Sequence, residues 1–161
     1  MLNSKEQLLL SSLRGKLVAL EFVLTTCPHC QRSAGIIERM YKEFGPLGFQ
    51  PVAAAINDNA QALVPEFIMK LGLTYPVGVT PRDMAYEFLE YNPNAPGAAP
   101  LYMPQIVFID RKGIIRAYYP GDDGFFKEPA AETNMRNQIE ALLKDTGSTK
   151  TASTKKPGPQ K

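Results

Sequence analysis

Hydrophobic and polar positions along the chain follow two periods, one typical of buried strands and one typical of amphipathic helices. Apolar runs at 17–24, 49–56 and 105–109 predict strands. The near-continuous run at 17–24 is typical of a strand buried on both faces, whereas Pro51 indicates that the first residues of the second run lie at a strand start or a sheet edge. After the first run, apolar residues recur at three- and four-residue spacing, at Ala34, Ile37, Met40, Tyr41 and Phe44. This spacing predicts an amphipathic helix over 28–44, which Gly45-Pro46 ends.

The rest of the chain continues the alternation of strand and helix. The expected elements, in chain order, are a helix at 57–71 capped by Asn57-Asp58-Asn59, a strand at 76–79, a helix at 80–91, a loop at 92–103, strands at 105–109 and 114–119, and a helix at 129–143. The order β-α-β-α-β-α-β-β-α predicts an α/β fold, in which helices cover both faces of a mixed sheet. No internal repeat or second domain is visible in the sequence.

The composition changes this picture little. The chain has 161 residues, of which 44% are hydrophobic and 21% charged, as in a soluble single-domain protein. No apolar run approaches the ~20 residues that a membrane-spanning helix needs, and residues 1–6 lack the apolar core of a secretory signal. The sequence therefore predicts either a cytosolic protein or a domain separated from its leader or anchor.

The positive charge is concentrated at the C-terminus. Residues 144–161 carry five lysines and one aspartate, and they contain no large apolar residue. Such a segment cannot bury enough surface to offset its ordering entropy, so we expect a disordered tail after a domain over 1–143. Because the lysines are dispersed, a solvated segment is predicted and no nucleic-acid partner is expected; an arm that binds nucleic acid or an anionic membrane is the alternative.

All cysteine and histidine in the chain lies in one tetrapeptide, Cys27-Pro28-His29-Cys30. Residues three apart at the start of a helix are neighbours on one face, so the two thiols can form a disulfide with little backbone motion. Cys27 at the helix start is expected to be the nucleophile because the helix dipole stabilises its thiolate, and the deeper Cys30 is expected to resolve the mixed disulfide. Pro28 and His29 are expected to tune the redox potential, with His29 favouring a more oxidising disulfide.

Other uses of the two thiols fit the sequence less well. A structural disulfide would close a loop too small to constrain the unfolded chain, and zinc needs more ligands than one tetrapeptide supplies. Covalent haem attachment needs a histidine directly after the second cysteine, where this chain has Gln31. A redox centre without a dissociable cofactor or metal is therefore predicted, and a binding module that holds copper(I) between the two thiolates is the alternative.

Three stretches together resemble the thioredoxin-like superfamily, and within it the membrane-anchored or periplasmic thiol-disulfide oxidoreductases of the TlpA/ResA type. They are Leu13-Arg14-Gly15-Lys16, Leu20-Glu21-Phe22-Val23 before the cysteines, and the run from Met103-Pro104-Gln105 to Gly113-Ile114-Ile115. The resemblance covers about residues 13–143 and implies a thioredoxin fold. Because Pro104 follows Cys30 by 74 residues, an extra helix-strand insertion is expected within 57–80.

The resemblance also implies roles for residues outside the tetrapeptide. Met103-Pro104 is expected to be a cis peptide that packs against the sulfurs and docks an extended substrate segment. Glu21 is expected to be a catalytic proton relay for Cys30, because apolar neighbours favour its burial and burial suits it to acid-base work. The chain departs from the family pattern at Thr26, where an aromatic residue usually precedes the first cysteine.

The family resemblance points to a monomer that exchanges electrons with protein thiols or disulfides, for example apocytochrome c or a copper-site protein, and that receives them from an upstream donor. It implies a site of action outside the cytoplasm, with any membrane anchor not part of this chain; a cytoplasmic protein is the alternative. Family resemblance favours a reductant. The tetrapeptide itself is that of the DsbA-like oxidants, so a disulfide oxidant is the alternative direction.

Overall fold

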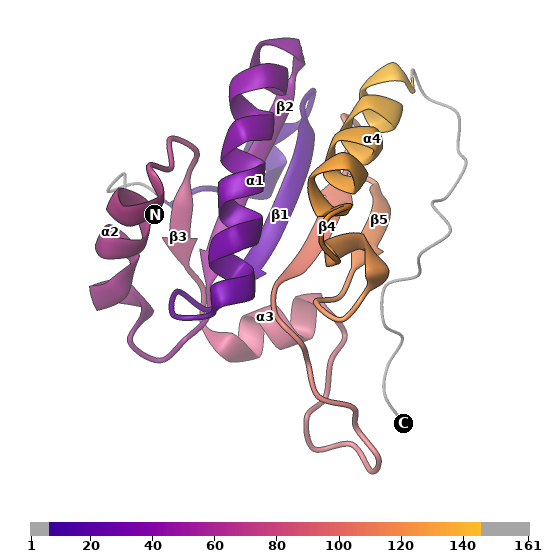
Figure 1. The fold of residues 1–161 in the computed structure, drawn as a ribbon. Coiled ribbons are helices and arrows are strands. Elements are labelled where there is room, and N and C mark those ends of the chain that lie inside the picture. The colour runs from indigo at the N-terminus through magenta and orange to yellow at the C-terminus, as the bar shows by residue number, and fades with distance from the viewer. Residues whose placement is uncertain (1–6, 146–161) are drawn as a thin grey trace.

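The computed structural model describes residues 7–145, and its elements appear in the order that the sequence predicts (Figure 1). The strands are β1 (Leu17–Val23), β2 (Phe49–Ala55), β3 (Val77–Val79), β4 (Gln105–Ile109) and β5 (Ile115–Tyr119), and the helices are α1 (Pro28–Phe44), α2 (Ala60–Leu71), α3 (Arg82–Phe88) and α4 (Ala131–Lys144). They form one five-stranded sheet in the order β3-β2-β1-β4-β5. Strands β1, β2 and β3 are parallel, whereas β4 runs antiparallel to both β1 and β5, so the predicted mixed sheet is confirmed.

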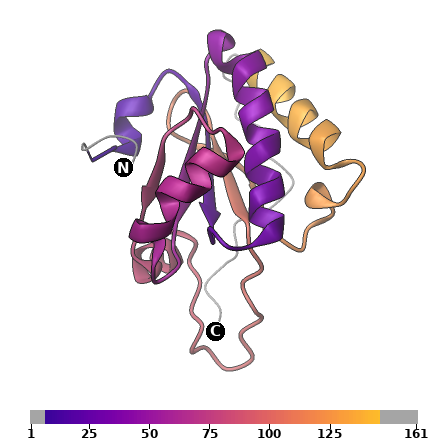
Figure 2. The same ribbon diagram turned by 60° about the vertical axis from the view of Figure 1, so that its left-hand side comes forward.

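Helices cover both faces of this sheet. On one face, α1, α2 and α4 pack over a cluster of apolar side chains that includes Cys30. Figure 1 shows α1 and α4 side by side in front of the sheet, and Figure 2 shows α2 on the same side of it. The other face is covered by the short α3 and by the N-terminal segment around Leu10 and Leu13. The fold is therefore the α/β arrangement that the sequence predicts, with helices on both faces of a mixed sheet.

The central strand β1 decides which side chains reach each face. Successive residues of a strand point to opposite sides, so Val18, Leu20 and Phe22 join the cluster under α3. Leu17, Ala19 and Val23 join the cluster under α1 instead. Glu21 lies in the same alternate series as the second set, which places a carboxyl group in the apolar layer beneath α1.

The predicted insertion at 57–80 contains α2 and β3, and β3 forms one edge of the sheet. The Asn57-Asp58-Asn59 stretch was predicted to cap this helix, and Asn59 does occupy the N-cap position before α2 begins at Ala60, although its side chain makes no capping hydrogen bond. The Asn57 side chain instead bonds to Thr25. The Thr25 backbone N–H donates to Asn57 Oδ1 at 3.2 Å, and Asn57 Nδ2 donates to Thr25 Oγ1 at 3.0 Å. Asn57 therefore braces the segment that leads to Cys27.

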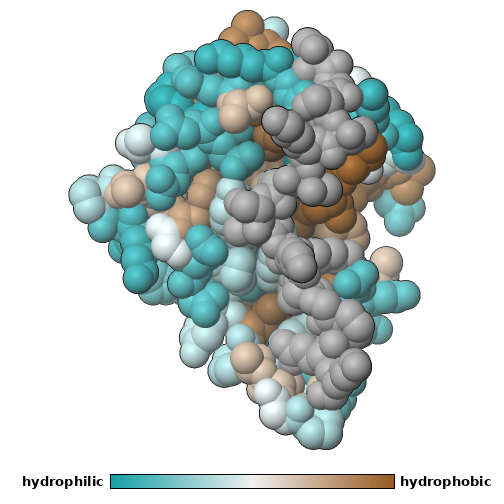
Figure 3. All heavy atoms as spheres, turned by 90° about the vertical axis from the view of Figure 1, so that its right-hand side faces the viewer, coloured by the Kyte–Doolittle hydropathy of each residue, from teal (hydrophilic) through white to brown (hydrophobic). Residues whose placement is uncertain are grey.

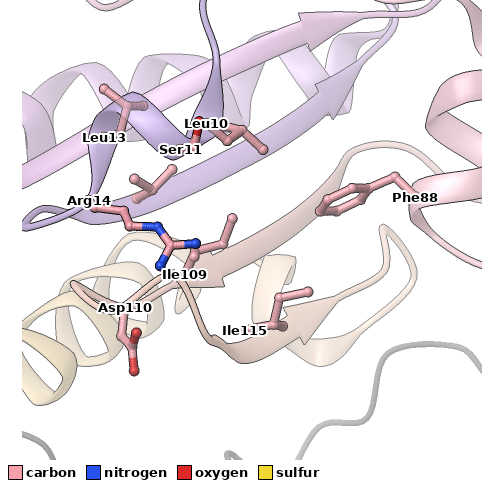
Figure 4. A pocket seen from close by; sticks show the side chains of 10 residues that line it. Leu10, Ser11, Leu13, Arg14, Phe88, Ile109, Asp110 and Ile115 are labelled. Atoms are coloured by element: carbon pink, nitrogen blue, oxygen red, sulfur yellow. The ribbon is translucent and has the colours of Figure 1, made fainter.

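The N-terminal segment leaves a pocket of about 190 Å³ on the α3 side of the sheet (Figure 4). Its lining is mainly apolar, with Arg14 and Asp110 among the side chains around it. Val18 contributes to this pocket and faces away from α1. The pocket therefore lies across the sheet from Cys30 and takes no part in the site described below.

The predicted tail begins at Lys144, which is the last residue of α4, and residues 146–161 lie outside the described residues. Figure 3 shows the side of the molecule that carries α4 and β5, where hydrophilic residues cover most of the visible described surface. Between residues 7 and 145, no helix has both the length and the apolar character needed to cross a membrane.

Candidate active site

The two cysteines lie at the junction between β1 and α1, and they differ in burial. Cys27 is the N-cap residue of α1 and is partly exposed, whereas Cys30 is fully buried in the cluster beneath the helix. The Cys27 N–H donates to Leu24 O at 3.1 Å, and Cys27 O accepts from Gln31 N–H at 3.0 Å. Both thiols are free. The predicted asymmetry, an accessible first cysteine and a buried second one, is confirmed in position.

The surroundings of Cys30 oppose its ionisation. Burial raises the pKa of the Cys30 thiol far above its ordinary value, and the negative charge of Glu21 and a hydrogen bond to the Cys27 side chain raise it further. A backbone hydrogen bond at Leu24 acts in the opposite direction and is outweighed. Cys30 therefore keeps its proton unless a neighbouring base removes it.

Glu21 is a buried acid near Cys30 whose carboxylate could act as such a base. The side chain is 1% exposed, and burial raises the pKa of its carboxyl group to about 8 even though a hydrogen bond from Ser33 lowers it. Ser33 Oγ donates to Glu21 Oε1. Oε2 is buried and has no hydrogen-bond partner among the described residues. The expected burial of Glu21 is confirmed, and one of its oxygens is free to accept a proton.

Ser33 lies one helical turn after Cys30 and holds the other carboxyl oxygen. In a Ser33→Ala variant the pKa of Glu21 is expected to rise further, because the hydrogen bond that favours the carboxylate is lost. A net hydrogen-bond energy of ~1 kcal/mol would slow a step that needs this carboxylate by about fivefold at pH 7. Titration of the Glu21 carboxyl carbon by NMR checks the shift. Ser12→Ala, which removes an exposed serine, is the control; an unchanged Glu21 midpoint in Ser33→Ala contradicts the expectation.

The Met103–Pro104 peptide bond is cis, as the family resemblance implies. In the antiparallel pairing of β1 with β4, Phe22 lies opposite Gln105, so Pro104 and Met103 continue alongside the end of β1 that leads to Cys27. Figures 1 and 2 both show the segment entering β4 beside the first turn of α1. Within residues 7–145, the Met103 N–H and C=O make no hydrogen bond, which leaves them available to an extended segment.

Gly121 packs directly against this segment. A Cβ atom at residue 121 would lie 2.6 Å from Tyr102 O and 2.7 Å from the Met103 carbonyl carbon, both of them backbone atoms that cannot rotate away. Gly121→Ala is therefore expected to displace the Met103 segment and to lower the free energy of unfolding by ~1–3 kcal/mol. Urea unfolding monitored by circular dichroism measures this change.

Gly124→Ala is the matched control, because a Cβ placed there would have no atom within 4 Å beyond those of Gly124 and its neighbours in the chain. Equal stability losses in the Gly121 and Gly124 variants would contradict the steric explanation. No local sequence pattern associates Gly121 with Met103, since the contact joins residues on opposite sides of the β4–β5 hairpin.

The structure brings the predicted tuning residues to the surface. Pro28 is the first residue of α1, and both Pro28 and His29 are exposed. Within the described part of the chain the His29 side chain makes no hydrogen bond to Cys27. Thr26, where the family has an aromatic residue, is also exposed beside Cys27. The tuning role of His29 stays a prediction.

Tyr75 is a buried neighbour of the site that the sequence analysis missed. It is fully buried, and its hydroxyl donates to Ala34 O at 3.4 Å. Burial raises the pKa of Tyr75 well above its ordinary value, and the charge of Glu21 raises it further. The side chain therefore stays neutral and adds to the apolar surroundings of Glu21. In the sequence Tyr75 is remote from both Glu21 and Cys30, so no local pattern could associate it with them.

No group of three or more His, Cys, Asp and Glu side chains that could hold a metal ion occurs within residues 7–145. What the described site contains is a pair of thiols, a buried carboxyl group near the inner one, and an unpaired main-chain segment beside them. This arrangement suits thiol-disulfide exchange, in which one sulfur must be reachable from outside and the other must be deprotonated inside.

A family model described as Redoxin matches residues 2–138. Among curated proteins, the chain is similar to "Thiol-disulfide oxidoreductase ResA" of Halalkalibacterium halodurans, with 29% identity over 116 residues, which are 72% of this chain and 60% of that protein. The protein of the same name from Oceanobacillus iheyensis is 29% identical over 131 residues, which are 78% of this chain and 63% of that protein. The chain thus spans less than two thirds of the length of these relatives.

Solved structures share the fold. A thiol:disulfide interchange protein of the thioredoxin family from Chlorobium tepidum superposes with a TM-score of 0.65 at 22% identity, over 83% of each chain. A secreted disulfide oxidoreductase of Mycobacterium tuberculosis superposes with a TM-score of 0.62 at 17% identity, over 82% of this chain and 86% of that one. These likenesses confirm the predicted thioredoxin fold.

Proposed function

Because the chain belongs to the Redoxin family, we propose that it is a thiol-disulfide oxidoreductase that exchanges dithiol and disulfide with protein substrates through Cys27 and Cys30. The similarity of the chain to curated proteins named "Thiol-disulfide oxidoreductase ResA" supports this function. The observation that carries the proposal is the position of the two thiols, one partly exposed at a helix start and one fully buried above a buried carboxyl group.

In the reducing direction the exchange has two steps. The Cys27 thiolate attacks a substrate disulfide, a mixed disulfide forms, and the first substrate sulfur leaves as a thiolate that takes a proton from solvent. Cys30 then loses its proton and attacks the Cys27 sulfur, which releases the second substrate thiol. The protein ends with a Cys27–Cys30 disulfide, and the substrate has gained two electrons and two protons.

Glu21 serves the second step as a general base. Since burial raises the Cys30 pKa far above the ordinary value, the thiol cannot supply a thiolate at neutral pH unaided. A pKa of about 8 places the titration of this carboxyl group near neutral pH, and a general base is most effective when its pKa lies near the pH of the reaction. The unpartnered Oε2 is the atom that would take the proton.

The partners in this proposal are protein disulfides or thiols, with apocytochrome c or a copper-site protein as the substrates that the family resemblance favours. A separate reductant regenerates the dithiol. The reducing direction and a place outside the cytoplasm follow from the same resemblance, and the Cys-Pro-His-Cys tetrapeptide supports oxidation as the second direction.

Reduction of insulin disulfides with dithiothreitol as electron donor tests the function. We expect catalysed precipitation of the insulin B chain at a rate proportional to the concentration of this protein. Absence of turnover, together with stoichiometric copper(I) that survives competition by a chelator, would overturn the proposal in favour of a copper-binding module. The reduction potential of the Cys27–Cys30 pair, measured against glutathione, then decides between reductant and oxidant.

A further inference from the structure

A chain of buried polar groups lies behind the Met103–Pro104 segment. Gln105, the first residue of β4, is fully buried, and its Nε2 donates to Tyr102 O at 2.5 Å. The hydroxyl of Tyr118, in β5, donates to Gln105 Oε1. Tyr118 is only 3% exposed. Burying an amide and a phenol without hydrogen-bond partners would cost free energy. The hydrogen bonds that these two side chains make offset that cost, and they indicate that Gln105 and Tyr118 hold the structure here in one arrangement.

The donor and the acceptor of each hydrogen bond between Tyr118, Gln105 and Tyr102 are fixed. A backbone carbonyl can only accept, so the amide group of Gln105 must face Tyr102 O with its nitrogen. Its oxygen then faces Tyr118, whose hydroxyl must donate. Burial raises the pKa of Tyr118 above its ordinary value, so the hydroxyl keeps the proton that it donates.

A second donor completes the coordination of Tyr102 O. The Gly121 N–H donates to the same oxygen at 3.1 Å. The two bonds occupy both lone pairs of the carbonyl and hold the peptide plane between Tyr102 and Met103 from one side. In a trans peptide the N–H points opposite to the C=O, so the Met103 N–H is directed away from Gln105 and Gly121.

We propose that Gln105 is a positioning residue that presents the Met103 main chain as a strand edge for extended peptide disulfides. This inference rests on the function proposed above and adds the means by which the site selects its substrate. An extended peptide would pair with the free Met103 N–H and C=O as an added strand, with its cysteine beside Cys27. A small disulfide without a peptide backbone cannot form these main-chain hydrogen bonds, so its reduction rate does not depend on them. Gln105 therefore sets the preference for peptide over small-molecule disulfides.

The test compares two substrates under single-turnover conditions. The reduced full chain is mixed with a disulfide-linked peptide or with dithiobis(nitrobenzoate), and the second-order rate constants are measured. In Gln105→Leu the ratio of the peptide to the small-molecule rate constant is expected to fall about fivefold to tenfold, the effect of losing one or two substrate hydrogen bonds. The fall in the peptide rate constant should come from a higher apparent dissociation constant of the peptide, and the limiting rate at saturating peptide should be unchanged.

Gln105→Leu leaves the Tyr118 hydroxyl buried without its partner, which can destabilise the fold. A variant with both Gln105→Leu and Tyr118→Phe removes the two partners together, which costs little stability. It is expected to show the same fall in the ratio. Tyr118→Phe alone keeps the bond from Gln105 to Tyr102 O, and its ratio is expected to stay within about twofold of wild type.

Substrates methylated at the main-chain nitrogen next to the reactive cysteine provide an independent readout. The wild type is expected to discriminate about fivefold against at least one methylated peptide, and the double variant to discriminate less than about twofold. Equal losses for both substrates in the two Gln105 variants, or unchanged discrimination, would overturn the positioning role. Failure of the wild type to reduce either disulfide would instead overturn the proposed function itself.

Discussion

Replacement of Cys27 by serine is expected to abolish disulfide reduction, with a loss on the order of a thousandfold or more. Cys27 is the partly exposed thiol, whereas Cys30 is fully buried and burial raises its pKa far above the ordinary value. Cys30 therefore cannot take over the attack on an external disulfide. Turnover of insulin with dithiothreitol measures the loss.

Cys30→Ser is the matched variant and is expected to fail differently. Its Cys27 can still attack, but no second thiol resolves the mixed disulfide, so a covalent complex with the substrate accumulates. Intact-protein mass spectrometry after mixing with a peptide disulfide should detect this complex in Cys30→Ser and not in Cys27→Ser. A complex that forms through Cys30 in the Cys27→Ser variant would reverse the assignment of nucleophile and resolving thiol.

The fold was predictable because its decisive signals are local. The apolar run over 17–24 and the helical spacing over 28–44 each follow from burial of one face or both. Element ends were less predictable, and the cause is visible at Asn57. The Asn57 side chain could cap a helix or contact a distant turn, and only the tertiary structure brings the Thr25 backbone nitrogen within 3.2 Å of its Oδ1.

The site was predictable to the extent that its residues are close together in sequence. The spacing of Cys27 and Cys30 identifies them as a redox pair. Ser33 could also have been predicted as a site residue, because it lies one helical turn after Cys30 on the same face of α1. Tyr75 and Gly121 meet the site only through the fold, so the sequence contains no local signal for them. Glu21 is intermediate, since its apolar neighbours indicate burial and only the packed structure shows what its two oxygens contact.

Glu21 also links the chemistry to stability, because its carboxyl group titrates at different pH in the folded and unfolded chain. The folded pKa is about 8, against an ordinary value of 4.5. Below pH 4.5 the group is protonated in both states, and between these values only the unfolded chain is ionised. Stability is therefore lost as pH rises through this interval, and above the folded pKa no further loss comes from this group.

Glu21→Gln is expected to remove this pH dependence while it impairs resolution. The neutral amide resembles the protonated acid, so at pH 4 the variant should be about as stable as wild type, and at pH 9 more stable by on the order of 5 kcal/mol. Urea unfolding under reducing conditions at both pH values measures the difference. Glu87→Gln, which changes an exposed carboxyl group on α3, is the control and should follow wild type at both.

The same variant separates a proton acceptor from a merely buried acid. In wild type the rate of mixed-disulfide resolution should rise about tenfold per pH unit below pH 8 and then level, since the carboxylate is the reactive form. In Glu21→Gln the inflection near that pH should disappear, and the rate at pH 7 should fall by ~10²-fold. If resolution in the variant keeps both the wild-type rate and the wild-type inflection, the proton leaves Cys30 by another route, and the burial of Glu21 is only a cost to the fold.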